Sequence, residues 1–176
     1  MKQFDWEGVM PAITTQFDKN GVLDLKAFRN NLSNQIKAGV HGIILGGTLG
    51  EASTLKDLEK KELLATTLDE VDGKIPVIMN IAEQATSKAV ELAKELEAEG
   101  ADGLMLLPPM RYKANDQETV AYFSSVASST SLPIMIYNNP VDYKIEVTLD
   151  MFEKLKEHKN ISAVKESTRD VTNITR

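Results

Sequence analysis

The sequence has 176 residues, of which 42% are hydrophobic and 26% charged, a balance that suits one globular domain with a buried core. Its net charge of −6 argues against a nucleic-acid partner, which would need clustered Lys and Arg, and the lack of cysteine excludes disulfides, thiolate catalysis and cysteine-ligated metals. The polar, acidic N-terminus is unlike a signal peptide and no apolar run reaches the roughly 20 residues of a membrane span, so we expect a cytoplasmic protein with no membrane partner.

In chain order, six short apolar runs alternate with longer amphipathic stretches. The runs are residues 9–14, 40–45, 75–81, 103–107, 132–137 and 161–165. Each run is nearly continuous in apolar side chains and does not alternate with polar ones. This pattern is typical of strands that are buried on both faces of a parallel sheet.

The stretches between the runs carry signals for helix starts and ends. Asp, Thr and Asn accept hydrogen bonds from the free backbone N–H groups at a helix start, and glycine suits the left-handed residue at a helix end. We expect two of the helices to end at Gly39 and Gly100. The predicted N-cap residues are Asp24, Thr54, Thr86, Asn115 and Thr148.

The spacing of the runs predicts the fold. Successive runs lie about 30 residues apart, the size of a βαβ unit, and such units in a row predict a parallel sheet with right-handed crossovers. A doubly wound sheet would usually carry a GxGxxG loop after its first strand, and TTQFDKNGVLD has none. The glycine-rich and polar motifs instead follow several strand ends, where barrels hold their chemistry, so we predict a (β/α)8 TIM barrel.

An eight-unit barrel typically needs about 250 residues. We therefore expect residues 1–176 to form a single catalytic barrel domain that covers about the first six βα units and is truncated at the C-terminus. The last residues, DVTNITR, are then expected to start a sixth helix.

The first motif that carries chemistry is Gly-Gly-Thr-Leu-Gly-Glu at residues 46–51, directly after the second run. Glycines allow sharp turns in which backbone N–H groups converge on an anion, here a carboxylate. Thr48 adds a hydroxyl that can donate to the anion or relay a proton. The same letters also fit an ordinary glycine-rich turn before a helix, and by themselves they leave both interpretations open.

Tyr137 closes the fifth run in the motif Tyr-Asn-Asn-Pro, residues 137–140. A phenol acts as an acid or a base when its pKa is shifted towards neutrality. The structural alternative is a strand-end tyrosine with a satisfied hydroxyl, followed by an Asn-Pro turn.

Lys165 closes the sixth run in the motif Ile-Ser-Ala-Val-Lys-Glu-Ser, residues 161–167. Lysine is rarely buried without a partner, and burial favours the neutral amine that attack on a carbonyl requires. A lysine that reaches solvent or pairs with Glu166 is the alternative interpretation.

Taken together, the motifs resemble the dihydrodipicolinate synthase / N-acetylneuraminate lyase family of barrels that form Schiff bases. The resemblance runs from residue 8 to the end of the chain and includes VMPAITTQFDKNGVLD, GTLGEASTL, IPVIMN, LPIMIYNNP and ISAVKES. It implies that Lys165 forms the imine and that Tyr137 shuttles protons and places the substrate. It also implies that Thr48 takes part in carboxylate binding and proton relay, in a substrate-binding loop shaped by Gly47.

The sequence departs from the family pattern at positions that would bind substrate. Leu49 replaces a second hydroxyl of the loop, so carboxylate binding is expected to rest more on backbone N–H groups. Asp142 stands about where synthases of this family carry an arginine for the carboxylate of the aldehyde, and an acid there would repel that group. A relay tyrosine of the family aligns with either Arg111 or Tyr112, and Arg111 can itself bind a carboxylate.

The resemblance implies a carbon–oxygen or carbon–carbon lyase or synthase that forms a lysine imine with pyruvate or a related 2-oxo acid. The protonated imine is itself the electron sink, so neither a cofactor nor a metal is expected. The expected partners are a small-molecule 2-oxo acid and further copies of the chain, as a dimer or tetramer.

Several functions share this first half-reaction. They are dihydrodipicolinate synthase itself, a sugar-acid aldolase or dehydratase, and a deaminase of 1-pyrroline-4-hydroxy-2-carboxylate. A barrel fragment without catalysis, or a scaffold subunit, is the alternative from a different class.

Overall fold

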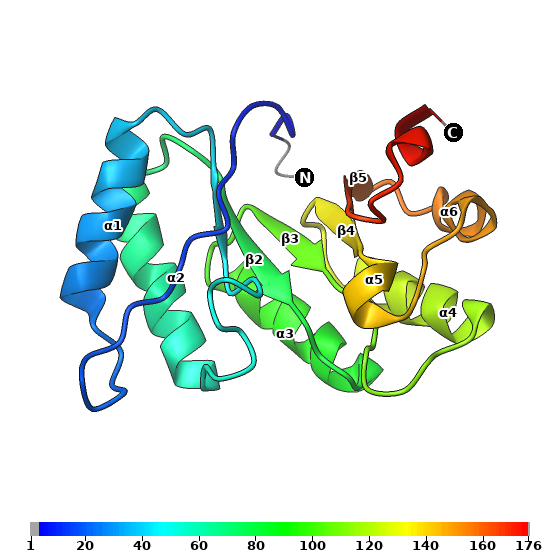
Figure 1. Cartoon of the computed structure of the whole chain (residues 1–176), viewed down its shortest axis with the longest axis horizontal. Helices are drawn as coiled ribbons and strands as arrows, with labels where there is room; N and C mark the ends of the chain where they lie inside the picture. Colours follow the sequence, from blue (N-terminus) through cyan, green and yellow to red (C-terminus); the bar gives the residue numbers. More distant parts are fainter. Residues whose placement is uncertain (1–3, 176) are drawn as a thin grey trace.

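Five parallel strands form one sheet whose spatial order follows the chain. The computed structural model describes residues 4–175 (Figure 1). The strands are β1 (Ile43–Leu45), β2 (Val77–Ile81), β3 (Gly103–Leu106), β4 (Ile134–Asn138) and β5 (Ile161–Glu166). A doubly wound sheet would reverse its order at a switch point, whereas the order β1-β2-β3-β4-β5 is that of a barrel wall. The predicted barrel architecture is confirmed.

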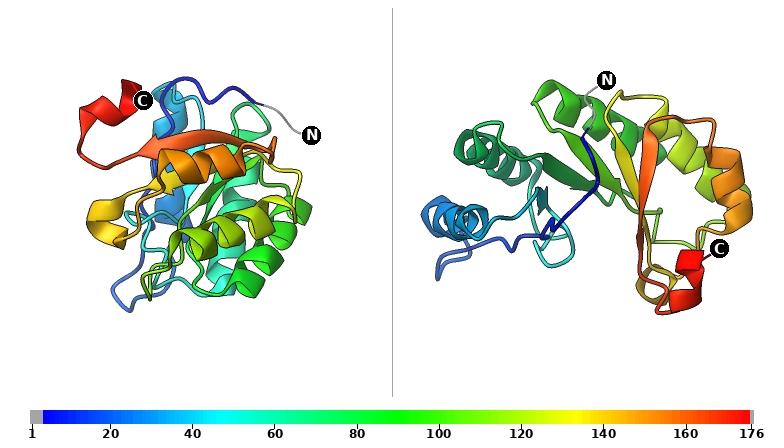
Figure 2. Two further views of the ribbon diagram at one scale, coloured as in Figure 1. Left: turned by 90° about the vertical axis from the view of Figure 1, so that its right-hand side faces the viewer. Right: turned by 90° about the horizontal axis from the view of Figure 1, so that it is seen from above.

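The longer helices lie along one side of the curved sheet, and the single turn of α5 (Pro140–Tyr143) contacts its inner face (Figure 2). They are α1 (Leu25–Lys37), α2 (Asp57–Val71), α3 (Thr86–Ala98), α4 (Asp116–Ala127), α5 (Pro140–Tyr143) and α6 (Leu149–Leu155), followed by the 3-10 helix η1 (Val171–Thr175). Seen from above, α1 to α4 and α6 follow one another around the outer side of the sheet (Figure 2). Within residues 4–175 no helix is long and apolar enough to cross a membrane.

Three of the predicted N-caps are confirmed. Asp24, Asn115 and Thr148 each accept a hydrogen bond from a backbone N–H in the first turn of α1, α4 and α6. The two predicted glycine ends are also confirmed, because Gly39 and Gly100 have φ angles of +82° and +99°.

The predicted starts at Thr54 and Thr86 are wrong. Helix α2 begins two residues later than predicted, at Asp57, with Lys56 as its N-cap. The Thr54 hydroxyl donates to the carbonyl of Glu51, so Thr54 belongs to the preceding turn rather than to the start of α2. Thr86 is already the first residue of α3.

The first apolar run, residues 9–14, is not a strand, so the predicted six strands become five. The run nevertheless lies parallel to β1 and forms one bridge, between Ala12 and Ile44. The Ile13 N–H donates to the Ile44 carbonyl and the Ile44 N–H to the Pro11 carbonyl. Pro11 has no N–H of its own to extend the ladder, which limits pairing at this edge. The expected sixth helix is only the short η1.

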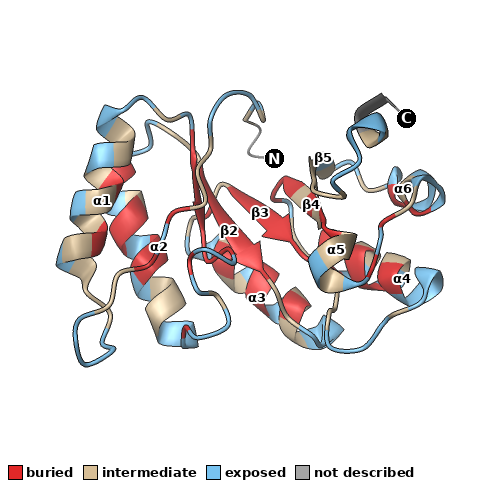
Figure 3. Ribbon diagram, viewed as in Figure 1, coloured by how far each residue is buried: buried red, intermediate tan, exposed pale blue. Residues whose placement is uncertain are grey.

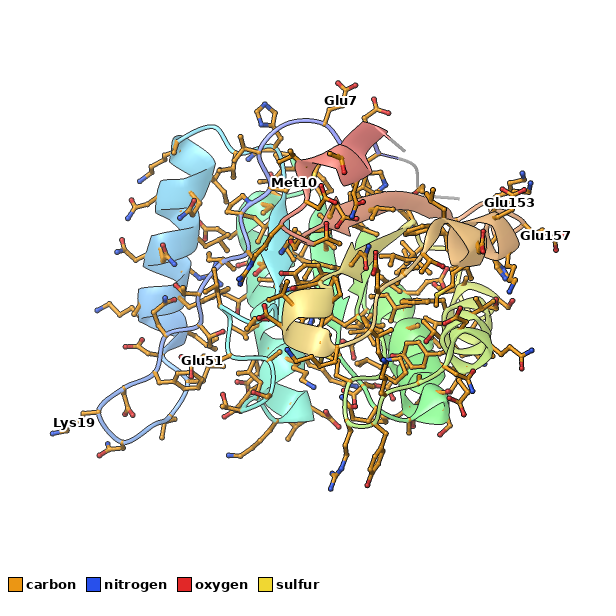
Figure 4. All side chains as sticks on the ribbon, turned by 45° about the vertical axis from the view of Figure 1, so that its right-hand side comes forward. Glu7, Met10, Lys19, Glu51, Glu153 and Glu157 are labelled. Atoms are coloured by element: carbon orange, nitrogen blue, oxygen red, sulfur yellow. The ribbon has the colours of Figure 1, made fainter. Side chains whose placement is uncertain are left out.

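Two apolar clusters lie on opposite faces of the sheet. The larger one fills the space between strands and helices, and most strand residues are buried (Figure 3). The smaller one lies on the inner face, around Ile44, Ile78 and Met105, and includes Tyr137. The acidic side chains of Glu153, in α6, and Glu157, just after it, point away from both clusters (Figure 4). The candidate site lies on this inner cluster.

A β-bulge between β4 and β5 determines which side chains of β5 point to the inner face of the sheet. Ile134 pairs with Ile161, but the next residue of β4, Met135, pairs with Ala163, so Ser162 is an extra residue in β5. Beyond the bulge, Tyr137 lies directly opposite Lys165.

Asn138 fastens the end of β4 to its surroundings. Its side chain is 2% exposed, and its Oδ1 accepts from the Val147 N–H at 2.9 Å. Its Nδ2 donates to Glu166 Oε2 at 3.0 Å and to the Val147 carbonyl at 3.3 Å. This amide therefore joins β4, β5 and the segment before α6.

We predict that Asn138→Ala lowers the free energy of unfolding by about 1–3 kcal/mol, because it leaves buried donors and acceptors without partners. Urea denaturation followed by circular dichroism measures the loss. Asn34→Ala, at an exposed position of α1, is the matched control and should change the stability little. Equal stability of the two variants would contradict this role of Asn138.

Candidate functional site

Lys165 and Tyr137 meet at the C-terminal end of the sheet. They are directly opposite residues of β5 and β4, and the Lys165 Nζ lies 4.0 Å from the centre of the Tyr137 ring. A cation at this distance over an aromatic face is attracted to it. Glu166 accepts hydrogen bonds from Asn138 Nδ2 and the Thr168 N–H, and among the described residues it forms no ion pair with Lys165.

The environment of Tyr137 favours its ionised form. Burial acts to raise the pKa of this phenol, but a hydrogen bond from Asn139 Nδ2 and the positive charge of Lys165 act against it. Hydrogen bonds from Ser167 and Lys165 add to these effects, and the pKa of Tyr137 is held below its ordinary value. A phenol of this kind is suited to acid–base work.

The glycine-rich loop after β1 is held in place by two long-range hydrogen bonds. The Thr15 hydroxyl donates to the Gly50 carbonyl at 2.7 Å, and Asn80 Nδ2 of β2 donates to the Gly46 carbonyl at 2.8 Å. A Cβ at Gly50 would lie 3.0 Å from the carbonyl oxygen of Ile13, so any larger residue there would crowd the backbone of residue 13.

Only some backbone N–H groups of this loop donate to carbonyls within the loop. Those of Gly50, Glu51 and Ala52 donate to carbonyls of residues 47 and 48. The N–H groups of Thr48 and Leu49 meet no acceptor among the residues that the structure describes. The Leu49 side chain is 69% exposed, so its contribution to a site would come from its backbone.

Thr48 is connected to Tyr137 through Tyr143, the last residue of α5. The hydroxyls of Thr48 and Tyr143 lie 3.2 Å apart, and the rings of Tyr143 and Tyr137 meet edge to face with centres 5.4 Å apart. Burial raises the pKa of Tyr143; the hydrogen bond with Thr48 opposes the rise, and the neighbouring Tyr137 and Asp142 add to it. Tyr143 therefore keeps its proton while Tyr137 is disposed to lose one.

Asn139 links Tyr137 to Asp142. Its Nδ2 lies 3.3 Å from the Tyr137 hydroxyl and 2.7 Å from Asp142 Oδ2, and its Oδ1 accepts from the Asp142 N–H as the N-cap of α5. Through Asn139, the exposed Asp142 carboxylate is thus placed near the Tyr137 hydroxyl.

Arg111 and Tyr112 lie on the exposed loop between β3 and α4. The Tyr112 side chain is 77% exposed, and the guanidinium carbon of Arg111 lies 6.0 Å from the centre of its ring. Both line a hollow beside Lys113 and the start of α4, apart from the cluster of Lys165 and Tyr137. Within this chain they are not brought together with the other predicted site residues.

A cavity of about 380 Å³ opens beside the Thr48–Tyr143 pair. Its wall also includes Asn80, Glu83 and Lys60, whose Nζ lies 3.4 Å from Glu83 Oε1. The exposed Lys19 and Glu51 mark the loops at this end of the molecule (Figure 4).

Comparison with known proteins decides the family. The model of the dihydrodipicolinate synthetase family matches residues 5–176. The chain belongs to this family.

Its members include a 4-hydroxy-tetrahydrodipicolinate synthase of Bartonella quintana, 36% identical over 166 residues, which are 94% of this chain and 56% of that protein. The solved dihydrodipicolinate synthase DapA-2 of Bacillus anthracis is 33% identical, with a TM-score of 0.93 over 98% of this chain and 59% of that one. YagE of E. coli K12, solved in complex with pyruvate, is 29% identical, with a TM-score of 0.89 over 95% and 56%. The chain thus spans somewhat more than half the length of the relatives that it matches.

Tyr143 and Asn139 are the residues of this candidate site that the sequence analysis missed. Asn139 stands in the Tyr-Asn-Asn-Pro motif, where an asparagine before Pro140 is a good helix cap, and that signal predicts a helix start at this point. Tyr143 has no such signal, because its contact with Thr48 joins residues 95 apart in the sequence.

We predict that Lys165→Met raises the pKa of the Tyr137 phenol, because it removes the positive charge that favours the phenolate. Nuclear magnetic resonance titration of chain labelled with ¹³C in its tyrosine rings measures the change. Lys19→Met, at a distant exposed turn, is the control and should leave this titration unchanged. An unaltered Tyr137 titration in Lys165→Met would show that the amine does not act on the phenol.

Proposed function

We propose that this chain holds the imine-forming centre of a lyase or synthase that acts on pyruvate or a related 2-oxo acid, with Lys165 as the nucleophile. The observation that carries the proposal is the pairing of Lys165 with Tyr137 at the C-terminal end of the sheet. Membership of the family and the likeness to YagE, whose solved complex contains pyruvate, support it.

In the proposed reaction the neutral amine of Lys165 attacks the 2-oxo carbon and a C–N bond forms. The amine loses one proton and the former carbonyl oxygen gains one, which gives a carbinolamine. Tyr137 then donates its proton to the carbinolamine hydroxyl, the C–O bond breaks, water leaves, and the nitrogen lone pair forms the protonated imine. The resulting phenolate lies beside a positive charge, which stabilises it.

The loop after β1 is proposed to bind the carboxylate of the 2-oxo acid. Thr48 and Leu49 offer backbone N–H groups without acceptors among the described residues, and the Thr48 hydroxyl adds a further donor. Gly47 gives the loop its shape. Converging donors of this kind would orient the acid so that its carbonyl carbon faces Lys165.

The second half-reaction is proposed to involve a partner or leaving group without a second carboxylate. The observation that favours this is the position of Asp142, because the same Asn139 amide donates to its carboxylate and to the Tyr137 hydroxyl. A negative charge there repels an anionic partner but accepts hydrogen bonds from hydroxyl or amino groups. A sugar-acid aldolase or dehydratase, or a deaminase of a hydroxylated pyrroline carboxylate, meets this condition better than a synthase that takes an anionic aldehyde.

We predict that borohydride reduction in the presence of pyruvate traps one adduct, on Lys165. Peptide mapping by mass spectrometry locates it. Lys165→Met should abolish the adduct, and Lys156→Met, on the exposed end of α6, should keep it. The absence of an adduct in folded chain, or an adduct on another lysine, would overturn the imine proposal and favour a chain without catalysis.

We also predict that aspartate semialdehyde is a poor second substrate. In a protein that forms the imine, condensation should stay below a kcat/KM of about 10⁴ M⁻¹s⁻¹, the lower end of ordinary enzymes. Coupled spectrophotometric assay of the condensation product measures this. A higher value would restore the synthase reading, and Asp142→Asn should raise a low one if the carboxylate is the cause.

A further inference from the structure

Asn139, the residue before α5, is buried, and each polar atom of its side chain has a partner. It is 5% exposed. Its Oδ1 accepts from the Asp142 N–H at 3.3 Å, and its Nδ2 lies 2.7 Å from Asp142 Oδ2 and 3.3 Å from the Tyr137 hydroxyl. An amide nitrogen carries two hydrogens, so it can donate to the carboxylate and to the phenol at the same time. A buried amide therefore joins an exposed charge to the hydroxyl that the proposed reaction uses as an acid.

The Asp142 carboxylate determines which end of this amide faces Tyr137. If the amide were reversed, its carbonyl oxygen would lie where Nδ2 now lies, 2.7 Å from a carboxylate oxygen. The amide nitrogen would then meet the Asp142 N–H, which is also a donor. Two mismatched contacts of this kind are costly at a buried position. The Tyr137 hydroxyl therefore meets a donor at residue 139 and not an acceptor.

The orienting carboxylate belongs to the same short turn as the amide. The preceding residue, Asn138, is bonded within the sheet and to the segment before α6, whereas Asn139 caps the turn that begins at Pro140. Proline suits this first helical position because its φ is already helical. The turn brings Asp142 back beside the capping residue, three positions earlier in the chain.

The other polar neighbours of the Tyr137 oxygen are also donors. Lys165 of β5 and Ser167 just after it form hydrogen bonds with this oxygen that favour the phenolate. Among the described residues, no carboxylate or carbonyl oxygen accepts a hydrogen bond from the Tyr137 hydroxyl. The titratable groups that face Tyr137 are Lys165 on β5 and Tyr143 on α5, with Asp142 one amide further away.

A phenol whose oxygen receives hydrogen bonds keeps its own hydrogen for a group that enters the site. The phenol has one hydrogen to donate, and its oxygen can accept while that hydrogen is given elsewhere. In the proposed reaction this hydrogen goes to the carbinolamine hydroxyl. An acceptor at residue 139 would bind the same hydrogen and turn it away from the substrate, whereas a donor also stabilises the phenolate that remains after the transfer.

Resting on the proposed imine chemistry, we propose that Asn139, oriented by Asp142, is a positioning residue that keeps the phenolic hydrogen of Tyr137 directed at the substrate. In the step concerned, the phenolic O–H bond breaks and the proton goes to the carbinolamine hydroxyl. The C–O bond breaks, water leaves, and the nitrogen lone pair forms the protonated imine. Asn139 neither gains nor loses a proton, and its hydrogen bond to the phenol becomes a stronger one to the phenolate.

Exchange of the two side chains, Asn139→Asp together with Asp142→Asn, tests the proposal. One carboxylate and one amide remain, so the net charge is unchanged. The cap of α5 is kept because Asp and Asn are comparable N-caps, and residues 139 and 142 can still bond to each other with donor and acceptor reversed. The group that faces Tyr137 changes from an amide donor to a carboxylate acceptor.

We expect the exchange to lower the rate of borohydride-trappable imine formation at saturating pyruvate at least about tenfold. The apparent affinity for pyruvate should change little, because the loop after β1 is untouched. The pKa of Tyr137 in the ¹³C titration should rise, since the phenol then donates to a carboxylate. A folded exchange variant with the native rate and the native titration would overturn the role of Asn139.

A second variant serves if the exchanged chain does not fold. Asn139→Ser keeps a good N-cap but removes the amide donor, and it should also raise the Tyr137 pKa and slow trapping. Asn115→Ser, at the cap of α4, is the matched control, since Asn115 Oδ1 accepts from the Glu118 N–H at 3.0 Å in the same way. It should lower the melting temperature to a similar extent and leave the titration and the rate unchanged.

A merely structural role of Asn139 predicts that the two serine variants lose similar stability and that neither alters the titration or the trapping rate. That result would overturn the proposal and leave the imine chemistry standing. If the native chain forms no adduct with pyruvate, the imine proposal fails instead. The titration of Asn139→Ser against Asn115→Ser then decides whether the amide acts on the phenol.

Discussion

One cross-strand pairing, Tyr137 opposite Lys165, organises the candidate site of this chain. It depends on the single extra residue in β5, because strand side chains alternate between faces and a shift of one residue exchanges them. Without Ser162 as the bulged residue, Val164 would lie opposite Tyr137, and Lys165 would face the helices. The bulge therefore brings the amine over the phenol, on the face where the loop after β1 also lies.

The same crowded face produces opposite effects on two tyrosines. Burial acts to raise the pKa of both phenols. At Tyr137 the positive charge of Lys165 and several donors outweigh burial, whereas at Tyr143 the neighbouring phenol and Asp142 add to it. Two chemically identical groups within one ring contact are thus separated into one that gives up a proton and one that holds it. Such a separation is a common way to assign acid and base roles in an active site.

Much of this arrangement could be predicted from the sequence, because the ends of parallel strands converge at one edge of the sheet. The apolar runs locate β1 to β5, and the residues that close the last two, Tyr137 and Lys165, are adjacent for that reason. Residues 9–14 look like a further strand, but Pro11 interrupts the donors of the ladder. The position of Tyr143 could not be predicted, because a single turn of helix has no periodicity and the partner Thr48 is far away in the sequence.

The short helix α5 couples two functions that the barrel otherwise keeps apart. The strands fix the amine and the phenol, while in the proposed reaction the loops that follow them would choose the partner of the second half-reaction. Asn139 belongs to both, since one amide donates to the Tyr137 hydroxyl and to the Asp142 carboxylate. A change of charge at residue 142 would therefore alter both the field that an incoming partner meets and the hydrogen bond that helps to hold the phenol. Under the proposed reaction, a new side chain at residue 142 must leave the Asn139 amide able to donate to Tyr137.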